Sequence, residues 1–269
     1  MQLIVANLVF SVGQVPPIWD VSPWLDQRTR TPEKGIHLLE AQMHRRFIKS
    51  HLPADGLPYF SNAKYIVVGR DGRDVFMSLW NHYRNYTDQA YKRLNDTPGR
   101  VGPPLPSCPE DIREFWSDWI TRGWFDWECE GYPYWSNLRH LATWWRCGGL
   151  QNVMFVHYSD LLADLVGQIR LVADFLEFDT TEEEVAAIAQ EVTFENVKQN
   201  ADRLLPQATD SFKGGAKTFL HQGKNGRWKQ VLTRSDLELY ATAVRRELSE
   251  DCATWLEHGS LSKVRIISS

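Results

Sequence analysis

Two segments of the chain each combine a short apolar run, a turn and an amphipathic stretch. The first starts with Lys64 to Gly69 (KYIVVG), and Arg70-Asp71-Gly72 follows it as a turn. Val75, Leu79 and Tyr83 then recur at helical spacing. This order predicts a strand, a turn and a helix.

The second segment repeats the pattern. Val153 to Tyr158 (VMFVHY) is again apolar and rich in β-formers, Ser159-Asp160 follows, and Ile169, Val172 and Leu176 mark one face of a helix. Two such units predict parallel strands joined by crossover helices. We therefore expect an α/β fold with a central parallel sheet flanked by helices.

Other patterns predict further helices. The apolar run from Leu3 to Val12 is far shorter than the ~20 residues of a membrane span, so it predicts a core helix. Thr181 with Glu184 and Ser235 with Glu238 have the spacing of capping boxes, so helices are expected to begin near both.

Two stretches lack periodicity. Residues 200–227 are rich in Gly, Lys and Gln and predict a long loop, which in compact domains is usually functional or disordered. Residues 96–109 hold five prolines and two glycines and predict a surface excursion.

Composition limits the function classes. The 269 residues are 43% hydrophobic, enough to fill one core, so we expect a single domain over residues 1–269. The formal charge of -4 argues against nucleic acid as a partner, and any anion must meet a local site. The four cysteines are widely spaced, which favours a reduced cytoplasmic location and gives no metal-ligand pattern.

Tryptophan is unusually frequent. Five of the twelve tryptophans lie between Trp116 and Trp135. They are expected to form either a buried aromatic layer or the wall of an acceptor pocket.

Arg70 and Ser78 are candidates for binding a phosphate. Arg70 ends the first predicted strand, and Ser78 lies eight residues later on the following helix. Ligands of α/β sheets bind at the carboxyl ends of strands, where an Arg fork and helix N–H groups suit an anion. The alternative is a surface ion pair of Arg70 with Asp71 or Asp74.

Two further segments carry candidate chemistry. Lys49 and His51 flank one serine, and histidine is the side chain best suited to take a proton near neutral pH. Gly223 to Lys229 (GKNGRWK) has two glycines and three cations. It predicts either a backbone nest around an anion or a solvated turn.

Taken together, five ordered motifs resemble those of the cytosolic sulfotransferase family. They are Lys49 to Pro53, Ile66 to Val75 leading to Ser78, Val156 to Leu161, Thr193-Phe194-Glu195, and Gly223 to Lys229. The resemblance extends from the first residues to about Glu238. It implies a single-domain sulfotransferase fold, similar to that of P-loop kinases, with residues 87–140 as an insertion on the acceptor side.

The resemblance also implies a reaction. Family members transfer a sulfuryl group from 3′-phosphoadenosine 5′-phosphosulfate (PAPS) to a hydroxyl or amine and release 3′,5′-ADP (PAP). By resemblance, His51 is the general base, Lys49 supports the transfer site, and Arg70 and Ser78 hold the 3′-phosphate. The Trp-rich segment would suit an aromatic or lipid-like alcohol as acceptor.

The remaining donor contacts follow the same resemblance. Tyr158 corresponds to a tyrosine that contacts adenosine, and Phe194 to a phenylalanine that packs on adenine. Thr193, Gly223 and Lys224 complete the implied nucleotide site.

Three departures from the family pattern bear on activity. His221-Gln222-Gly223 stands where the family has Arg-Lys-Gly, and Val192-Thr193-Phe194 stands where it has Thr-Ser-Phe. The family's N-terminal strand and its Tyr-Pro-Lys-Ser-Gly-Thr-Thr-Trp loop, which cradles the 5′-phosphosulfate, have no counterpart. Gln2 to Phe10 resembles the helix after that loop, so we expect either a start upstream of Met1 or a truncated form.

Two rival functions stay open at this point. One is a catalytically impaired homologue that binds 3′,5′-ADP without turnover, and the other is a nucleotide-dependent kinase of related fold. Lys229, Thr233 and Glu238 also match three positions of a short dimerisation motif of the family, so a homodimer is a further expectation.

Overall fold

The computed structural model describes residues 1–100 and 102–259. The chain folds into two compact units. The first unit consists of Met1–Ser50, Asn81–Ser107 and Ile169–Gly223, and the second of His51–Trp80, Cys108–Gln168 and Lys224 onward. The single domain expected over residues 1–269 stays a prediction.

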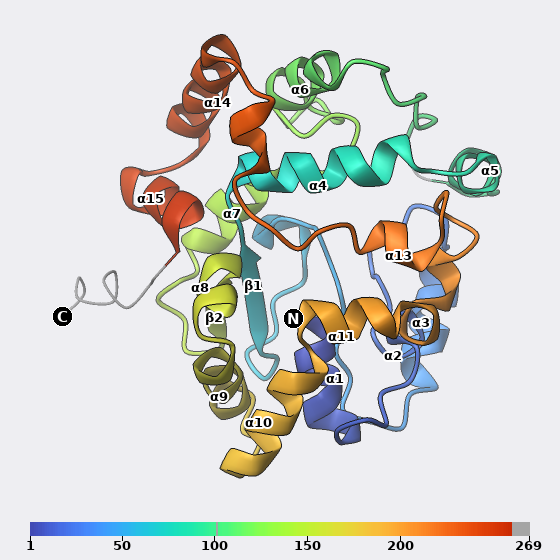
Figure 1. The fold of residues 1–269 in the computed structure, drawn as a ribbon, viewed down its shortest axis with the longest axis vertical. Coiled ribbons are helices and arrows are strands. Elements are labelled where there is room, and N and C mark those ends of the chain that lie inside the picture. Colours follow the sequence, from blue (N-terminus) through green and yellow to red (C-terminus); the bar gives the residue numbers. More distant parts are fainter. Residues whose placement is uncertain (101, 260–269) are drawn as a thin grey trace. The chain divides into compact units, whose positions relative to one another are not determined.

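The second unit contains the sheet. Strands β1 (Tyr65–Gly69) and β2 (Val153–His157) pair in parallel, with Tyr65 opposite Val153 and Gly69 opposite His157 (Figure 1). Both strands are rich in Val, Ile and Phe, the β-branched and aromatic residues that pack well on a pleated surface. The predicted parallel pairing is therefore confirmed.

Helices complete this unit. Helix α4 (Gly72–Arg84) follows β1 and continues into the first unit, and α9 (Leu165–Phe175) also belongs to both. The other elements of the second unit are α6 (Ile112–Thr121), α7 (Asn137–Trp145), α8 (Tyr158–Ala163), α14 (Arg234–Glu247), α15 (Glu250–His258) and the 3₁₀ turns η1 (Ala54–Gly56) and η3 (Arg227–Gln230).

Aromatic side chains dominate the core of the second unit. Phe76 of α4 contacts Phe115, Trp116 and Trp119 of α6 at ring-centroid distances of 4.8–5.5 Å. Trp116 and Trp119 are fully buried, whereas Trp127 of the following loop is 62% exposed. The Trp-rich stretch is thus core packing in α6 and partly exposed beyond it.

In the described part of the first unit, the regular elements are helices, with two isolated bridges between irregular segments. Its elements are α1 (Gln2–Phe10), α2 (Ile18–Val21), α3 (Pro32–Glu40), α5 (Asp88–Asp96), α10 (Glu182–Glu191), α11 (Phe194–Gln199), α12 (Ala201–Leu204), the 3₁₀ turn η2 (Pro206–Ala208) and α13 (Ala216–Phe219). Helix α1 packs on α2 and α10, and buries Ile4, Val5 and Ala6, which confirms the core helix expected near the N-terminus.

The expectation of one long loop over residues 200–227 was wrong. Three short helical elements, α12, η2 and α13, lie within it, and Ala201, Leu204, Ala208 and Ala216 are buried in the core of the first unit. Helices of three or four residues are too short to produce a recognisable apolar period, so the sequence pattern missed them.

One of the two expected capping boxes was also misplaced. Thr181 and Glu184 cap α10 as predicted. Helix α14 instead begins after Thr233, whose side chain accepts a hydrogen bond from the amide of Asp236, while the Asp236 carboxylate accepts one from the amide of Thr233. Arg113 of α6 pairs with Asp236 at 3.0 Å, and this tertiary contact favours Asp236 over Glu238 as the capping acid.

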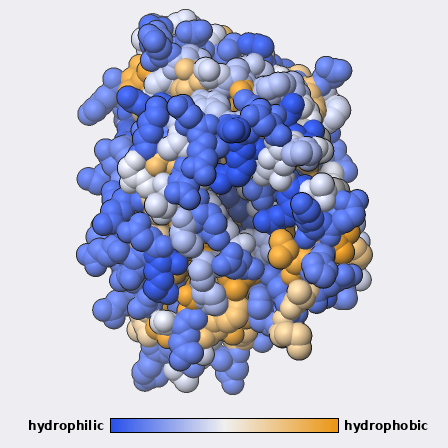
Figure 2. All heavy atoms as spheres, turned by 90° about the vertical axis from the view of Figure 1, so that its right-hand side faces the viewer, coloured by the Kyte–Doolittle hydropathy of each residue, from blue (hydrophilic) through white to orange (hydrophobic). Residues whose placement is uncertain are grey.

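One face of the protein is mainly polar. Figure 2 shows one face on which hydrophilic residues predominate and hydrophobic ones gather toward its lower part. Among the described residues, no helix combines the length and the apolar character needed to cross a membrane.

Candidate functional site

Arg70 stands at the centre of a polar cluster in the second unit. It follows β1, and its Nε donates to the Asn225 side-chain oxygen at 3.0 Å while Nη2 donates to the Lys224 carbonyl at 3.1 Å. The guanidinium also lies 4.3 Å from the ring centroid of Tyr158. A stacked and doubly hydrogen-bonded Arg has a defined orientation, so its remaining donors point in a fixed direction.

The sheet brings these residues together. Because β1 and β2 are parallel, Arg70 after β1 and Tyr158 after β2 emerge at the same edge. Asn225 Nδ2 donates to the Ser159 hydroxyl at 3.2 Å, so one amide links the ends of both strands. The predicted pair of Arg70 and Tyr158 is therefore adjacent, at the edge where ligands of α/β sheets bind.

The glycine turn after Lys224 surrounds a carboxylate of the protein itself. Gly226 has a left-handed backbone with φ +81°, and its amide donates to both carboxylate oxygens of Asp74, at 2.8 and 3.0 Å. The amide of Arg227 also donates to Asp74. The backbone nest exists, and the anion that it holds is Asp74.

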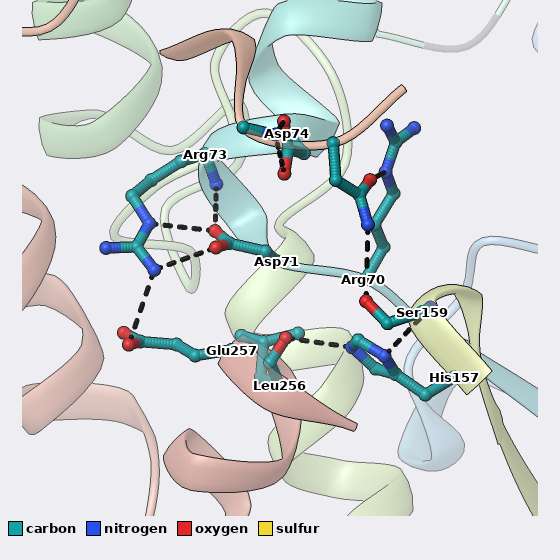
Figure 3. Close-up of polar contacts among 10 residues, drawn as sticks. Arg70, Asp71, Arg73, Asp74, His157, Ser159, Leu256 and Glu257 are labelled. Carbon is teal, nitrogen blue, oxygen red and sulfur yellow. Dashed lines mark hydrogen bonds and ion pairs between the residues drawn. The ribbon is translucent and has the colours of Figure 1, made fainter. Parts of the chain in front are cut away.

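Arg73, and not Arg70, forms the ion pair with Asp71. Their side chains meet at 2.7 Å, and Arg73 also lies 3.3 Å from Glu257 of α15 (Figure 3). The rings of Trp228 and Tyr240 flank the Arg73 guanidinium at 4.2 and 4.9 Å. Because Asp71 forms its ion pair with Arg73, it does not form the expected ion pair with Arg70.

His157 fixes the end of β2. Its Nε2 lies 3.0 Å from the Leu256 carbonyl and so donates to it, while Nδ1 accepts from the Ser159 amide at 3.2 Å. Burial lowers the pKa of His157. A neutral imidazole with one donor and one acceptor thus positions the first turn of α8, which carries Tyr158 and Ser159.

The charged groups around Arg70 are partly desolvated. Burial lowers the pKa of Arg70 and of Arg227, and raises the pKa of the Asp74 carboxyl. Ser78 is half-buried on α4, one turn beyond Asp74 and on the same helix face. An anion would be bound strongly here because the dielectric is lower than in water.

The two candidate transfer residues lie in different units. In the first unit, Lys49 forms a parallel bridge with Trp24, and its Nζ lies 4.9 Å from the Trp24 ring centroid. Burial lowers the pKa of Lys49. In the second unit, His51 stacks on Trp135 with centroids 4.9 Å apart, and its carbonyl accepts a hydrogen bond from His140.

The predicted adenine contacts lie in the first unit. Thr193 caps α11, with its hydroxyl accepting from the Asn196 amide and donating to the Gln190 carbonyl. Phe194 packs against Gly223 so closely that a Cβ at Gly223 would lie 2.6 Å from the ring. The structure therefore brings Phe194 and Gly223 together, while the Thr193 hydroxyl already serves as a helix cap.

Asn225 and Asp74 were missed as individual site residues. The sequence marked Asn225 only as part of the segment from Gly223 to Lys229, and Asp74 only as a possible ion-pair partner of Arg70. Asn225 contacts Arg70 across 155 residues of chain, so no local pattern could identify the pair. Among the described residues, no cluster of His, Cys, Asp and Glu is arranged to hold a metal ion.

Comparison with known proteins supplies an independent observation. The model of the sulfotransferase domain family matches residues 1–251. A glycolipid sulfotransferase of Mycobacterium bovis (strain BCG / Pasteur 1173P2) is 31% identical over 274 residues, covering 96% of this chain and 84% of the relative. Sulfotransferase 2B1 of Homo sapiens is 29% identical over 240 residues, covering 86% of this chain and 56% of the relative.

Solved structures have a similar fold. The structure of mouse sulfotransferase SULT7A1 complexed with PAP has a TM-score of 0.63 and is 21% identical in sequence. The match covers 84% of this chain and 73% of the mouse chain. Retinol dehydratase in a complex with retinol and PAP has a TM-score of 0.63 at 24% identity and covers 81% of this chain and 58% of its own.

Proposed function

This chain belongs to the sulfotransferase family, and we propose that it transfers the sulfuryl group of PAPS to a hydroxyl or amine of a small acceptor. The expected family, the α/β fold and the enzyme class are confirmed by the family match and the similar relatives. The donor agrees with the PAP named in the titles of the similar structures.

The observation that carries the proposal is the orientation of Arg70. Among the described residues, Nε donates to Asn225 and Nη2 to the Lys224 carbonyl, while Nη1 has no such partner and is assigned to a phosphate. Tyr158 stacks on the same guanidinium and presents an aromatic ring where a nucleoside would lie. We assign the donor's 3′-phosphate to Arg70 and Ser78, and its adenosine to Tyr158.

Other donor contacts are proposed from the resemblance. Phe194 is assigned to adenine, with Thr193 beside it. The backbone N–H of Gly223, which packs against Phe194, is assigned to the phosphate. Lys224 is exposed, so its ammonium is free to approach the nucleotide.

His51 is the proposed general base. Stacking on Trp135 restricts the orientation of its ring, and the hydrogen bond from His140 to its carbonyl restrains its backbone. His51 would take the proton of the acceptor hydroxyl as its oxygen bonds to sulfur, while the bond from sulfur to the bridging phosphate oxygen breaks and PAP leaves with the electron pair. Lys49 would stabilise negative charge on the sulfuryl group.

The proposed acceptor is a lipid-like or aromatic alcohol. Several relatives are named glycolipid sulfotransferases. Trp127 is exposed and stacks on Phe125 at 4.8 Å with the rings nearly parallel, in the segment that the family resemblance assigns to the acceptor side. A wall of flat rings suits a planar or lipid-like acceptor. The cytoplasmic location and the homodimer stay predictions.

The decisive experiment is titration of the protein with PAP, followed by transfer from ³⁵S-labelled PAPS to a panel of glycolipids, sterols and phenols. Tight PAP binding with labelled product would support the proposal. PAP binding without product from any acceptor would favour the rival of a catalytically impaired homologue. Binding of ATP with phosphoryl transfer, and no response to PAP, would favour a kinase.

Arg70→Ala is the variant that ties the result to this site. Loss of a charged contact worth about 1.5–3 kcal/mol should weaken PAP binding at least tenfold. Arg234→Ala is the matched control, because the Arg234 side chain is 94% exposed on α14.

A further inference from the structure

Arg227 interacts electrostatically with Arg70 and has no role in the nucleotide site outlined above. We propose that Arg227 is a second guanidinium for the donor's 3′-phosphate and acts with Arg70 in place of the cations lost at His221-Gln222. This inference rests on the proposed donor and assigns one more residue to its binding.

The backbone places Arg227 on the turn that Arg70 contacts. Asp74 accepts hydrogen bonds from the amides of Gly226 and Arg227, so one carboxylate on α4 anchors the turn that carries Arg227. Arg70 donates to the Lys224 carbonyl three residues earlier in the same turn. The turn thus orients Arg70 and also carries Arg227.

The charges of this cluster are unbalanced. Arg70 and Arg227 both interact with the Asp74 carboxylate. Burial lowers the pKa of Arg70, and the positive charge of Arg227 lowers it further. Asp71, the other nearby acid, is paired with Arg73. Two guanidinium groups facing one available carboxylate leave an excess positive charge, which matches a phosphate monoester.

Arg227 also carries an orphaned donor. Its Nε is buried and has no hydrogen-bond partner among the described residues. A buried N–H without a partner costs about 1–3 kcal/mol, so native proteins rarely retain one without a reason. A phosphate oxygen would satisfy this donor, as it would the Nη1 of Arg70.

Two cations of the family's phosphate-binding motif are replaced in this sequence, and Arg227 would compensate for one of them. The sequence has His221-Gln222 where sulfotransferases have Arg-Lys, so two cations of the resembled site are absent from those positions. Arg227 lies four residues beyond Gly223, on the turn that contains Gly226, and would restore one guanidinium.

The test compares two nucleotides that differ only in the 3′-phosphate. PAP and 5′-AMP are titrated into the protein, into Arg227→Ala and Arg227→Lys, and into the control Arg234→Ala, which removes an arginine whose side chain is 94% exposed. Arg227→Ala should weaken PAP binding about tenfold or more and leave AMP binding unchanged. Arg227→Lys should recover part of the loss, and Arg234→Ala should bind both nucleotides as the parent does.

Structural damage is distinguished by two readouts. A misfolded variant would lose AMP and PAP together, and that result would overturn the inference, as would unchanged PAP affinity in Arg227→Ala. The unliganded variant should melt no lower than the parent, because removing Arg227 removes an unsatisfied buried donor. If the parent itself binds PAP no better than AMP, the proposed donor fails as well.

Discussion

The Arg70 Nε donates to the Asn225 side-chain oxygen at 3.0 Å. The amide nitrogen of Asn225 donates in turn to the hydroxyl of Ser159. A single neutral side chain therefore sets the plane of the guanidinium and connects it to the end of β2. Asn225 is a positioning residue: it would act on the nucleotide through Arg70.

Asn225→Ala should weaken PAP several-fold, because Arg70 would lose one of the two hydrogen bonds that orient its fork. Asn225→Asp should weaken PAP further, since it adds a carboxylate that competes with phosphate for Arg70. Calorimetric titration with PAP measures both effects, and Gln230→Ala, at an exposed position of η3, is the control. If both Asn225 variants bind PAP as tightly as the parent does, Asn225 has no part in PAP binding.

His51→Ala should reduce sulfuryl transfer by about 10²–10⁴-fold and leave PAP affinity unchanged, because a general base acts on the acceptor and not on the nucleotide. The rate of labelled product formation at saturating PAPS measures the effect. His258→Ala, which removes an exposed histidine at the end of α15, should be neutral. Equal rates in His51→Ala and the parent would mean that another group accepts the proton.

Gly69→Ala should destabilise the second unit by about 1–3 kcal/mol. A Cβ at Gly69 would lie 2.3 Å from the ring of Trp255, and that ring is buried in α15. The free energy of unfolding in urea measures the loss. Gly149→Ala is the matched control, since a Cβ there meets nothing within 4 Å. Similar stability in the two variants would show that Trp255 can move away at little cost.

Glu130→Gln should change the pH dependence of stability. Burial raises the pKa of Glu130 to about 7 from 4.5, although its carboxylate accepts hydrogen bonds at the start of α7. The folded state then keeps a proton that the unfolded state has released, so this contribution to stability is present below pH 4.5 and is lost as the pH rises toward 7. Relative to the parent, Glu130→Gln should gain roughly 3 kcal/mol over that range.

Unfolding in urea at pH 4.5 and pH 7 gives the required comparison. Burial lowers the pKa of His82 to about 4 from 6.5, so its contribution runs in the opposite direction and is lost as the pH falls from 6.5 toward 4. His82 is present in both proteins, so the difference between variant and parent isolates Glu130. A difference that does not vary with pH would contradict the raised pKa.

Local pattern was sufficient for several elements. Alternating and apolar runs located β1, β2 and α1, and the spacing of Thr181 and Glu184 located the start of α10. Local pattern failed at the start of α14, where two pairs have the spacing of a capping box: Thr233 with Asp236, and Ser235 with Glu238. The ion pair of Asp236 with Arg113 of α6 favours the first pair. Local pattern also failed where helices of three or four residues replace the expected loop.

The sequence by itself determined that Arg70 follows a strand, that a glycine-rich segment carries cations, and that the motifs are those of sulfotransferases. These features depend on neighbouring residues, and local spacing records them. Tertiary structure decided that Asn225 orients Arg70, that Arg73 takes Asp71, and that Asp74 occupies the nest. Those pairings follow from the path of the chain, which brings together side chains up to 155 residues apart, and the hydrogen-bonding groups alone allow many other partners.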